Sequence, residues 1–381
     1  MAGSQSITKK GMHMKRSMLA VLAACTLFGA ASIQAAEVEM YGLIDLALGY
    51  SHIDDGSATT DTLEMKSGPN SQSRIGIRGS EDLGDGWKVG FVLENGFDAD
   101  TGAIGNQGRL FGRESQINVS GPFGTLKVGR MGALMSGLGT TGIFGGTVSA
   151  FPSAKATDVP NHKAVMGGVF SQHDNTVTYS TPKLAGFKVH AQYSMSRNTT
   201  VRDGRENSSA VDRYAALGIT YAGGPLKAVA IVDQLNYAKD TANDPSDAYT
   251  VSLGGNYDFG NVVLYAAMQH FKHAKPTVDY YNTHAAETGM GYGSGFGGIV
   301  TARIPLGAHA LKFGAGYMTM ESDKDSGNEL DRWVAIAGYQ YRFSKRTSYY
   351  LTAGWGQDSY SKSGAADGSV AAVESGIIHR F

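Results

Sequence analysis

The sequence predicts an all-β fold, a 16-stranded antiparallel transmembrane β-barrel. Three observations lead to this class. Segments of roughly ten residues alternate apolar and polar side chains, short turns alternate with long polar loops, and aromatic residues stand near the segment ends. Only 18% of the residues are charged and 52 of the 381 are glycine. Many amphipathic strands fit this composition better than a packed helical core does.

The alternation is clearest in segments 187–196, 249–259 and 311–317. Successive side chains of a strand point to opposite faces, so one face of each segment is apolar and the other polar. In the second segment the apolar face contains Tyr249, Val251, Leu253, Gly255, Tyr257 and Phe259. A soluble sandwich has the same period, so alternation alone does not decide between the two classes.

The connections between the segments decide it. Short turns are expected at 82–86, 121–124, 182–186, 222–225, 258–261, 305–309 and 343–346. Long loops are expected near 51–71, 97–109, 132–172, 197–211, 236–247, 273–292, 321–330 and 357–369. Eight long loops and seven short turns make 15 connections, and therefore 16 strands. Outer-membrane barrels sort their loops in this way, with short turns on the periplasmic side.

Aromatic residues near the predicted strand ends are interpreted as interfacial girdles, because such rings combine an apolar body with a polar tip. The residues so assigned are Tyr41, Tyr50, Trp87, Tyr193, Tyr221, Tyr257, Phe259, Phe313, Tyr341, Phe343, Trp355 and Phe381. Ordinary strand propensity is the alternative explanation.

The N-terminus resembles an export signal. Basic residues at 9, 10, 15 and 16 precede an apolar run over 18–33, which ends in small residues. We therefore divide the chain into 1–36, an N-terminal extension with a cleaved signal peptide, and 37–381, the barrel. Cleavage removes four of the 33 basic residues and no acidic one, leaving 29 basic against 34 acidic residues. This balance does not favour nucleic acid as a partner. The single cysteine, Cys25, lies within the signal.

Several motifs are familiar in this order and spacing. MYGLIDLALGY (40–50), SRIGIRGSEDLGDGWKVGFVLENGFDADTG (73–102), FGTLKVGR (123–130) and the C-terminal GIIHRF (376–381) resemble strands of the general bacterial porins. The likeness is greatest to the trimeric 16-stranded type of β-proteobacteria. It covers essentially the whole chain after the signal.

The resemblance implies an outer-membrane channel through which small hydrophilic solutes and ions diffuse passively, without cofactor or catalytic step. It also implies a homotrimer in contact with outer-membrane lipids and lipopolysaccharide. The terminal Phe381 matches the signal that the outer-membrane assembly machinery reads in such proteins. The third loop, 132–172, would fold into the lumen as a constriction facing basic residues of the wall.

The expected constriction residues are Arg74, Arg78, Arg113, Asp158, Lys155 and Lys163. Arg74 and Arg113 match wall arginines of the family, and Arg78 shares the polar face of its strand with Arg74. Strict alternation would point Arg113 at lipid unless a bulge or the strand end turns it inward. The family's acidic Pro-Glu-Phe segment is missing from the third loop, and Gln172 stands where the family often has arginine. We therefore expect weak anion selectivity.

Other readings are weaker. GSGFGG at 293–298 satisfies G-x-G-x-x-G, but no helix or βαβ unit follows it. His270, His273 and Asp279 are too few for a zinc site. No nucleophile, base and orienting group are marked for a hydrolase. Two other functions stay open: a barrel serving mainly as a surface adhesin, and a substrate-specific channel.

Overall fold

The computed structural model describes residues 37–151, 158–200, 204–239, 245–277, 290–362 and 366–381. The predicted signal segment 1–36, Lys155 and Asp279 lie outside the described residues. Within the described part the strands are β1 (Glu37–Asp54), β2 (Thr59–Ser67), β3 (Arg74–Gly84), β4 (Trp87–Asp98), β5 (Ala103–Ile104), β6 (Glu114–Gly121), β7 (Gly124–Gly132), β8 (Gln172–Ser180), β9 (Phe187–Ser194), β10 (Arg213–Gly223), β11 (Leu226–Asn236), β12 (Ala248–Asp258), β13 (Val263–Ala274), β14 (Gly293–Leu306), β15 (His309–Ser322), β16 (Glu329–Arg342), β17 (Thr347–Tyr360) and β18 (Gly368–Arg380).

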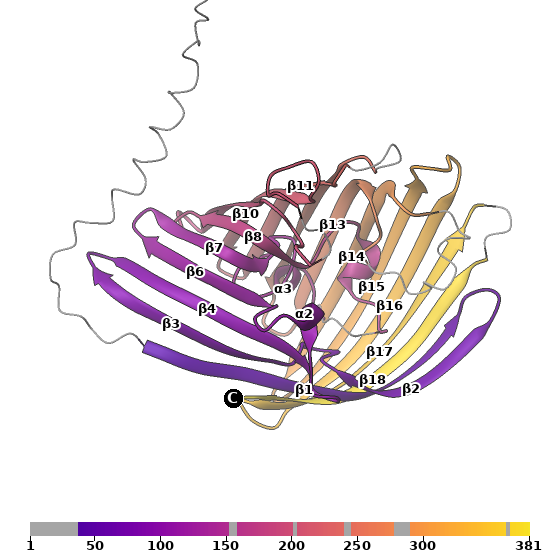
Figure 1. The fold of residues 1–381 in the computed structure, drawn as a ribbon. Helices are drawn as coiled ribbons and strands as arrows, with labels where there is room; N and C mark the ends of the chain where they lie inside the picture. Colours follow the sequence, from indigo (N-terminus) through magenta and orange to yellow (C-terminus); the bar gives the residue numbers. More distant parts are fainter. Residues whose placement is uncertain (1–36, 152–157, 201–203, 240–244, 278–289, 363–365) are drawn as a thin grey trace, which may run out of the picture.

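These strands form a closed antiparallel barrel of 16 positions, as predicted. β5 is a two-residue strand that pairs only with β4 inside a loop. β2 and β3 occupy a single position, because β1 pairs with β3 through 37–43 and with β2 through 46–54. The ring closes between β1 and β18 and continues to the last residue, where Phe381 and Gly42 exchange backbone hydrogen bonds of 3.0 and 3.1 Å. Figure 1 shows the C-terminus beside β1.

The long and short connections alternate as predicted, with one correction. Segment 51–71 was expected to be a loop, but β1 runs on to Asp54 and β2 returns from Thr59. Only 55–58 turns the chain at the top of this hairpin, and the strand is interrupted instead at 68–73. The backbone of β2 pairs with β1 along its whole length. Its threonines are polar, so a search for apolar alternation does not detect this strand.

The outer face of the barrel is apolar, as a bilayer requires. Leu48, Ile77, Leu253, Val300 and Ile377 all project outward and are exposed. At the short-turn end, aromatic rings contact one another on this face, including the pairs Trp87–Phe123, Phe187–Tyr221, Tyr257–Phe259 and Tyr341–Phe343. The assignment of Tyr41 to a girdle was wrong, because its hydroxyl donates to Glu94 on the lumenal face at 2.9 Å.

The helical turns of the described residues are short. They are α2 (Gly105–Gly108), α3 (Gly145–Val148) and the 3₁₀ turn η2 (His162–Val165). In the part of the chain that the structure describes, no helix has the length and apolar character needed to cross a membrane.

The third long loop folds into the lumen, as predicted, and there forms the main apolar core (Figure 1). Its side chains pack against inward-facing residues of β10 to β18. The loop contributes Leu134, Phe144, Val148, Phe151, Val159, Val165 and Met166, and the wall contributes Tyr214, Ile231, Phe271, Ile299, Met318, Val334, Ile336 and Val370. One half of the inner wall is therefore covered by the loop, and the other half is left to line the open lumen.

Candidate functional site

The open part of the lumen is a cavity of about 1130 Å³ between the third loop and the wall formed by β1, β3, β4, β6 and β7. Seven basic side chains line it, against two carboxylate side chains, Glu94 and Glu114. The basic residues are Arg74, Arg78, Arg113, Arg130, Lys163, Arg197 and Arg380. The charged groups of this cavity come from strands far apart in the sequence that the barrel places side by side.

Glu94 on β4 organises the first cluster. Arg113 donates from Nε to Glu94 Oε1 at 2.6 Å and also contacts Gln72, while Arg74 Nε lies 3.5 Å from Glu94 Oε2. Tyr41 donates to the same carboxylate. Two arginines thus share one carboxylate, so a net positive charge is left at the lumenal surface.

Both Arg113 and Arg130 contradict strict alternation, for related reasons. Arg113 precedes the first residue of β6, so the alternation of that strand does not extend to it; its backbone N–H donates to the Glu94 carbonyl at 3.1 Å and its side chain points to the Glu94 carboxylate in the lumen. Arg130 follows Gly129, whose φ of 136° marks a register shift between β7 and β8. A bulge of this kind re-aims the side chains beside it. Both side chains therefore line the lumen.

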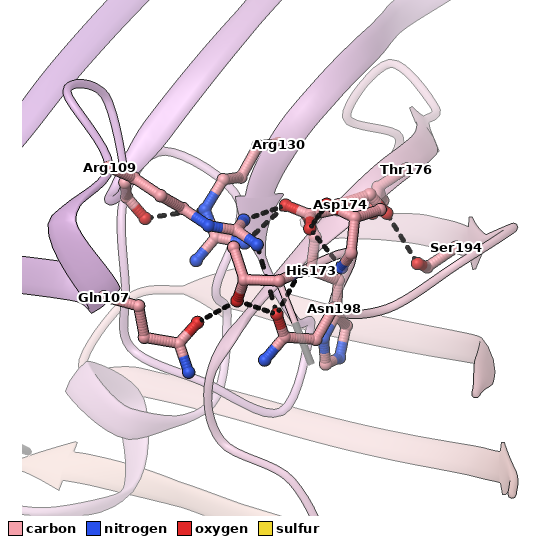
Figure 2. Close-up of polar contacts among 11 residues, drawn as sticks. Gln107, Arg109, Arg130, His173, Asp174, Thr176, Ser194 and Asn198 are labelled. Carbon is pink, nitrogen blue, oxygen red and sulfur yellow. Dashed lines mark hydrogen bonds and ion pairs between the residues drawn. The ribbon is translucent and has the colours of Figure 1, made fainter. Parts of the chain in front are cut away.

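A second cluster lies toward the long-loop end (Figure 2). Arg109 and Arg130 point toward Asp174 of β8 and contact its Oδ1 at 2.5 and 2.6 Å. Arg109 also donates to Asn198 at 3.1 Å, and Thr199 donates to the other Asp174 oxygen at 2.9 Å. Two guanidinium groups again share one carboxylate.

The other predicted constriction residues that the structure describes, Arg78, Lys163 and Asp158, lie in three different places. Arg78 lies in the lining near the short-turn end, exposed, with its Nε donating to Glu39 at 2.8 Å and its guanidinium 5.0 Å from the Tyr41 ring centre. Lys163 projects from η2 into the cavity lining, and burial lowers its pKa to about 8. Asp158 does not face the arginines. It contacts Lys66 of β2, and its backbone N–H donates to Glu374 of β18 at 3.3 Å.

Polar side chains of the wall hold the main chain of the third loop. Gln192 accepts from the Leu134 N–H at 3.0 Å, Thr301 from Ala150 at 2.9 Å, and Gln269 from Gly167 at 2.8 Å. Asn256 donates to the Thr147 carbonyl at 2.8 Å. Buried backbone groups require such partners.

One buried ion pair adds a further support for the loop. Arg332 of β16 makes a bidentate contact with Asp358 of β17, with both distances at 2.6 Å, and donates to the Ala164 carbonyl at 3.0 Å. A fork-to-fork pair of this geometry fixes direction as well as charge. The wall therefore holds η2 at a defined height in the lumen.

Nothing in the described residues assembles a metal centre, since no group of three or more His, Cys, Asp or Glu residues lies close enough together there. His273 Nδ1 lies 2.8 Å from Asp323 Oδ2 instead.

Known proteins with similar sequences are outer-membrane porins. A model of the Gram-negative porin family matches residues 19–360. An outer membrane porin protein of Bordetella pertussis is 32% identical, and the match covers 97% of this chain and all of that protein. The chain belongs to the Gram-negative porin family. Outer membrane porin protein 32 of Delftia acidovorans is 28% identical over 88% of each chain.

Solved porin structures share the fold. The anion-selective porin from Comamonas acidovorans superposes with a TM-score of 0.66 and 24% identity, covering 91% of this chain and 100% of that one. In-vitro folded OmpT of Vibrio cholerae gives a TM-score of 0.61 at 15% identity, covering 92% of this chain and 100% of that one.

This porin is a channel of the outer membrane that lets small hydrophilic solutes and ions diffuse passively through its lumen. Its family consists of channels rather than enzymes. The short turns then face the periplasm and the long loops the exterior. Arg78 and Arg380 stand at the periplasmic end of the porin lumen, and Arg197 and Asn198 at the outer end.

Sequence reasoning missed several lining residues of the porin, above all Arg130, Arg197, Arg380 and Glu114. Arg130 ends the quoted FGTLKVGR motif, and the glycine directly before it, Gly129, was the available signal of an irregular strand. Arg197 comes from a long loop, where alternation gives no direction.

Proposed function

We propose that the channel prefers anions weakly, with the third loop and the basic wall as its constriction. The observation that carries this proposal is the lining itself, in which seven basic side chains face two carboxylates. Both carboxylates are already engaged, because Glu94 contacts two arginines and Glu114 accepts from the Thr140 N–H at 2.8 Å. Within the lining itself, basic side chains therefore outnumber carboxylate side chains, and Arg78, Arg130 and Arg197 pair with Glu39, Asp174 and Asp212 outside it.

Local charge outweighs the formal charge of −5 that 29 basic and 34 acidic residues leave on the chain after removal of residues 1–36. The low-dielectric wall focuses the field in the lumen. Exposed charges beyond a Debye length of about 8–10 Å at physiological salt are screened. Outer-loop acids such as Asp54, which accepts from the Gly56 N–H at 2.8 Å, therefore act on ions much less than the lining does.

The anion-selective porin from Comamonas acidovorans shares the fold at 24% identity, and the selectivity in its name agrees with the proposal. Within the constriction we assign Arg74, Arg113 and Lys163 to the narrow region and Arg78 to its periplasmic mouth. Asp158 acts differently, as an anchor of the third loop to β2 through Lys66. Lys155 stays a prediction from the sequence.

Zero-current potential in a salt gradient tests the proposal directly. The unmodified protein in a planar bilayer should give the sign of an anion-selective channel. Arg74→Glu should shift the potential toward cations, because it places a second carboxylate beside Glu94. Asp54→Asn is the matched control on an outer hairpin and should leave the potential nearly unchanged. A cation-selective unmodified channel would contradict the proposal.

We further propose that the chain works as a homotrimer among outer-membrane lipids and lipopolysaccharide, after export directed by residues 1–36. OmpT of Vibrio cholerae has been solved in a trimer form, and its fold is shared at a TM-score of 0.59. No catalytic step belongs to this function.

Phe381 is proposed as the signal for the outer-membrane assembly machinery. Its backbone closes the seam with Gly42, and its ring lies against the same glycine. Deleting Phe381 should lower the yield of heat-resistant trimer in the outer-membrane fraction. His379→Ala, which changes the outward face two residues earlier, is the control, and normal trimer yield from the deletion would contradict the role.

A further inference from the structure

The second long loop, 99–113, folds inward across the lumen wall instead of standing away from it. Its turn α2 contains two successive residues in the left-handed region, Asn106 with φ 53° and Gln107 with φ 65°. Neither residue is glycine, so both carry the steric penalty of that conformation. The turn lies against the inner side of β4, where a Cβ atom on Gly96 would touch Asn106 (Figure 1).

Two glycines make room for the turn. A Cβ atom on Gly112 would meet the Cβ of Asn106, and a Cβ on Gly96 of β4 would meet Asn106 Oδ1 at 2.5 Å. The turn is therefore packed between the wall at Gly96 and the returning segment of its own loop at Gly112. Strained backbone persists only where its surroundings over-determine it, and here the surroundings supply contacts on each flank.

Hydrogen bonds fix the two side chains through their carbonyl oxygens. Gln72 Nε2 donates to Asn106 Oδ1 at 3.3 Å, and Thr200 Oγ1 donates to Gln107 Oε1 at 2.6 Å. The Arg109 contacts with Asp174 and Asn198 tie the end of the turn to the same outer loop as Thr200 (Figure 2). This loop thus bridges from β4 to the connection between β9 and β10.

The amide NH₂ groups are the parts of these side chains that remain for a solute. Within the described residues, neither Asn106 Nδ2 nor Gln107 Nε2 donates to a protein group, and both residues line the same cavity as Arg113, Arg130 and Arg197. An amide NH₂ group offers two donors and no charge.

We propose that the Asn106–Gln107 turn is a second constriction of the channel, on the outer side of the third loop. It narrows the passage and offers neutral hydrogen-bond donors to solutes that carry acceptor oxygens. The inference goes beyond the proposed anion preference and does not depend on it, since it requires only the channel.

The width of the passage at the Asn106–Gln107 turn can be measured by the size of the neutral polymers that it excludes. Poly(ethylene glycol)s of graded size are added to the outer side of the channel in a planar bilayer, and the largest size that enters is read from the conductance. The double variant Asn106→Gly/Gln107→Gly keeps the left-handed backbone and removes both side chains. It should admit larger polymers from the outer side and conduct more.

Asn207→Gly is the matched control. Asn207 also has a positive φ, 60°, but it is exposed, accepts from the outward-facing Tyr193 and does not line the cavity. This variant should leave the polymer cut-off unchanged. An unchanged cut-off in the double variant would overturn the inference.

A charge placed on the turn gives an independent test. Gln107→Glu should shift the zero-current potential toward cations at 0.1 M salt, and the shift should shrink at 1 M, where the Debye length falls from about 10 Å to about 3 Å. Asn207→Asp should shift it less. Equal shifts from the two variants would overturn the inference. Failure of the proposed anion preference is a separate outcome, because it appears as the wrong sign in the unmodified channel.

Discussion

The two halves of the inner wall do different work. From β3 to β8 the inward side chains are charged and polar, and they face the open lumen. From β10 to β18 many inward side chains are apolar, and the third loop covers them. The comparison teaches that the barrel separates the anchoring of the loop, in the holding half, from the selection of solutes, in the filtering half: burial of apolar surface fixes the loop on one side, and charged side chains that line the lumen act on solutes on the other.

Carboxylates are used differently in the two halves. On the filtering side, Glu94 and Asp174 are each shared by two arginines. On the holding side, Arg332 and Asp358 form a bidentate pair that is almost fully buried. Two guanidinium groups therefore share one carboxylate where ions pass, whereas both oxygens of Asp358 are contacted by the same guanidinium group where the loop is anchored.

The largest expected effect follows from breaking the pair on the holding side. Arg332→Met leaves the Asp358 carboxylate buried without its partner, which costs roughly 3–5 kcal/mol. The thermal unfolding midpoint of the folded protein in detergent should fall clearly. Arg78→Met is the control, because its exposed pair with Glu39 contributes about 0–1 kcal/mol. Equal losses from the two variants would contradict the contrast.

Overpacking the same half should have the next largest effect. A Cβ on Gly297 of β14 would overlap the Val165 carbonyl oxygen, so Gly297→Val should push η2 away from the wall at a cost of about 1–3 kcal/mol. Single-channel conductance should change with it. Gly146→Ala borders the same cavity and would meet no atom within 4 Å, so it should leave conductance and stability unchanged.

Arg113→Met removes an arginine from an ion pair of the filtering half, as Arg332→Met does in the holding half. Glu94 keeps its contacts with Arg74 and Tyr41, so the loss of stability should be smaller than for Arg332→Met, roughly 1–3 kcal/mol. The zero-current potential should shift toward cations, whereas Arg332→Met should change it little in the channels that still fold. A larger loss of stability than for Arg332→Met would contradict the division of work.

The smallest effect is expected from pH. Lys163 carries positive charge below its pKa of about 8 and loses it above that value. Anion preference should therefore weaken between pH 7 and pH 9, and the change should be reduced in Lys163→Met. Zero-current potentials at the two pH values measure it. An identical pH dependence in the variant would show that another group is responsible.

The sequence was sufficient to predict the strands, the sorting of the connections and the inward third loop. Alternation did not assign the faces of a strand where both faces are apolar. In β16, Trp333 faces lipid while Val334 and Ile336 face the third loop, so alternation between apolar and polar side chains disappears. Inward-facing side chains are apolar there because a lumenal wall covered by a loop is as dry as the core of a soluble protein.

Local irregularities account for the remaining misses at the site. Arg130 faces the lumen because of the register shift at Gly129, and Asp158 meets Lys66 because the third loop crosses the whole lumen. β2 was missed because its polar residues gave no alternation. Each case depends on contacts between residues far apart in the chain, and the alternation of apolar and polar residues along one strand does not reveal such contacts.

The wall recognises the third loop through main-chain groups, with Gln192, Asn256, Gln269 and Thr301 as partners. Main-chain groups are the same whatever side chain a residue carries. Substitutions on the side of the loop that borders the passage therefore leave these attachments intact. The side chains of the loop that face the passage can therefore be substituted while the barrel and the attachments of the loop stay the same. Permeability can change in this way, in evolution or by engineering, without a new barrel.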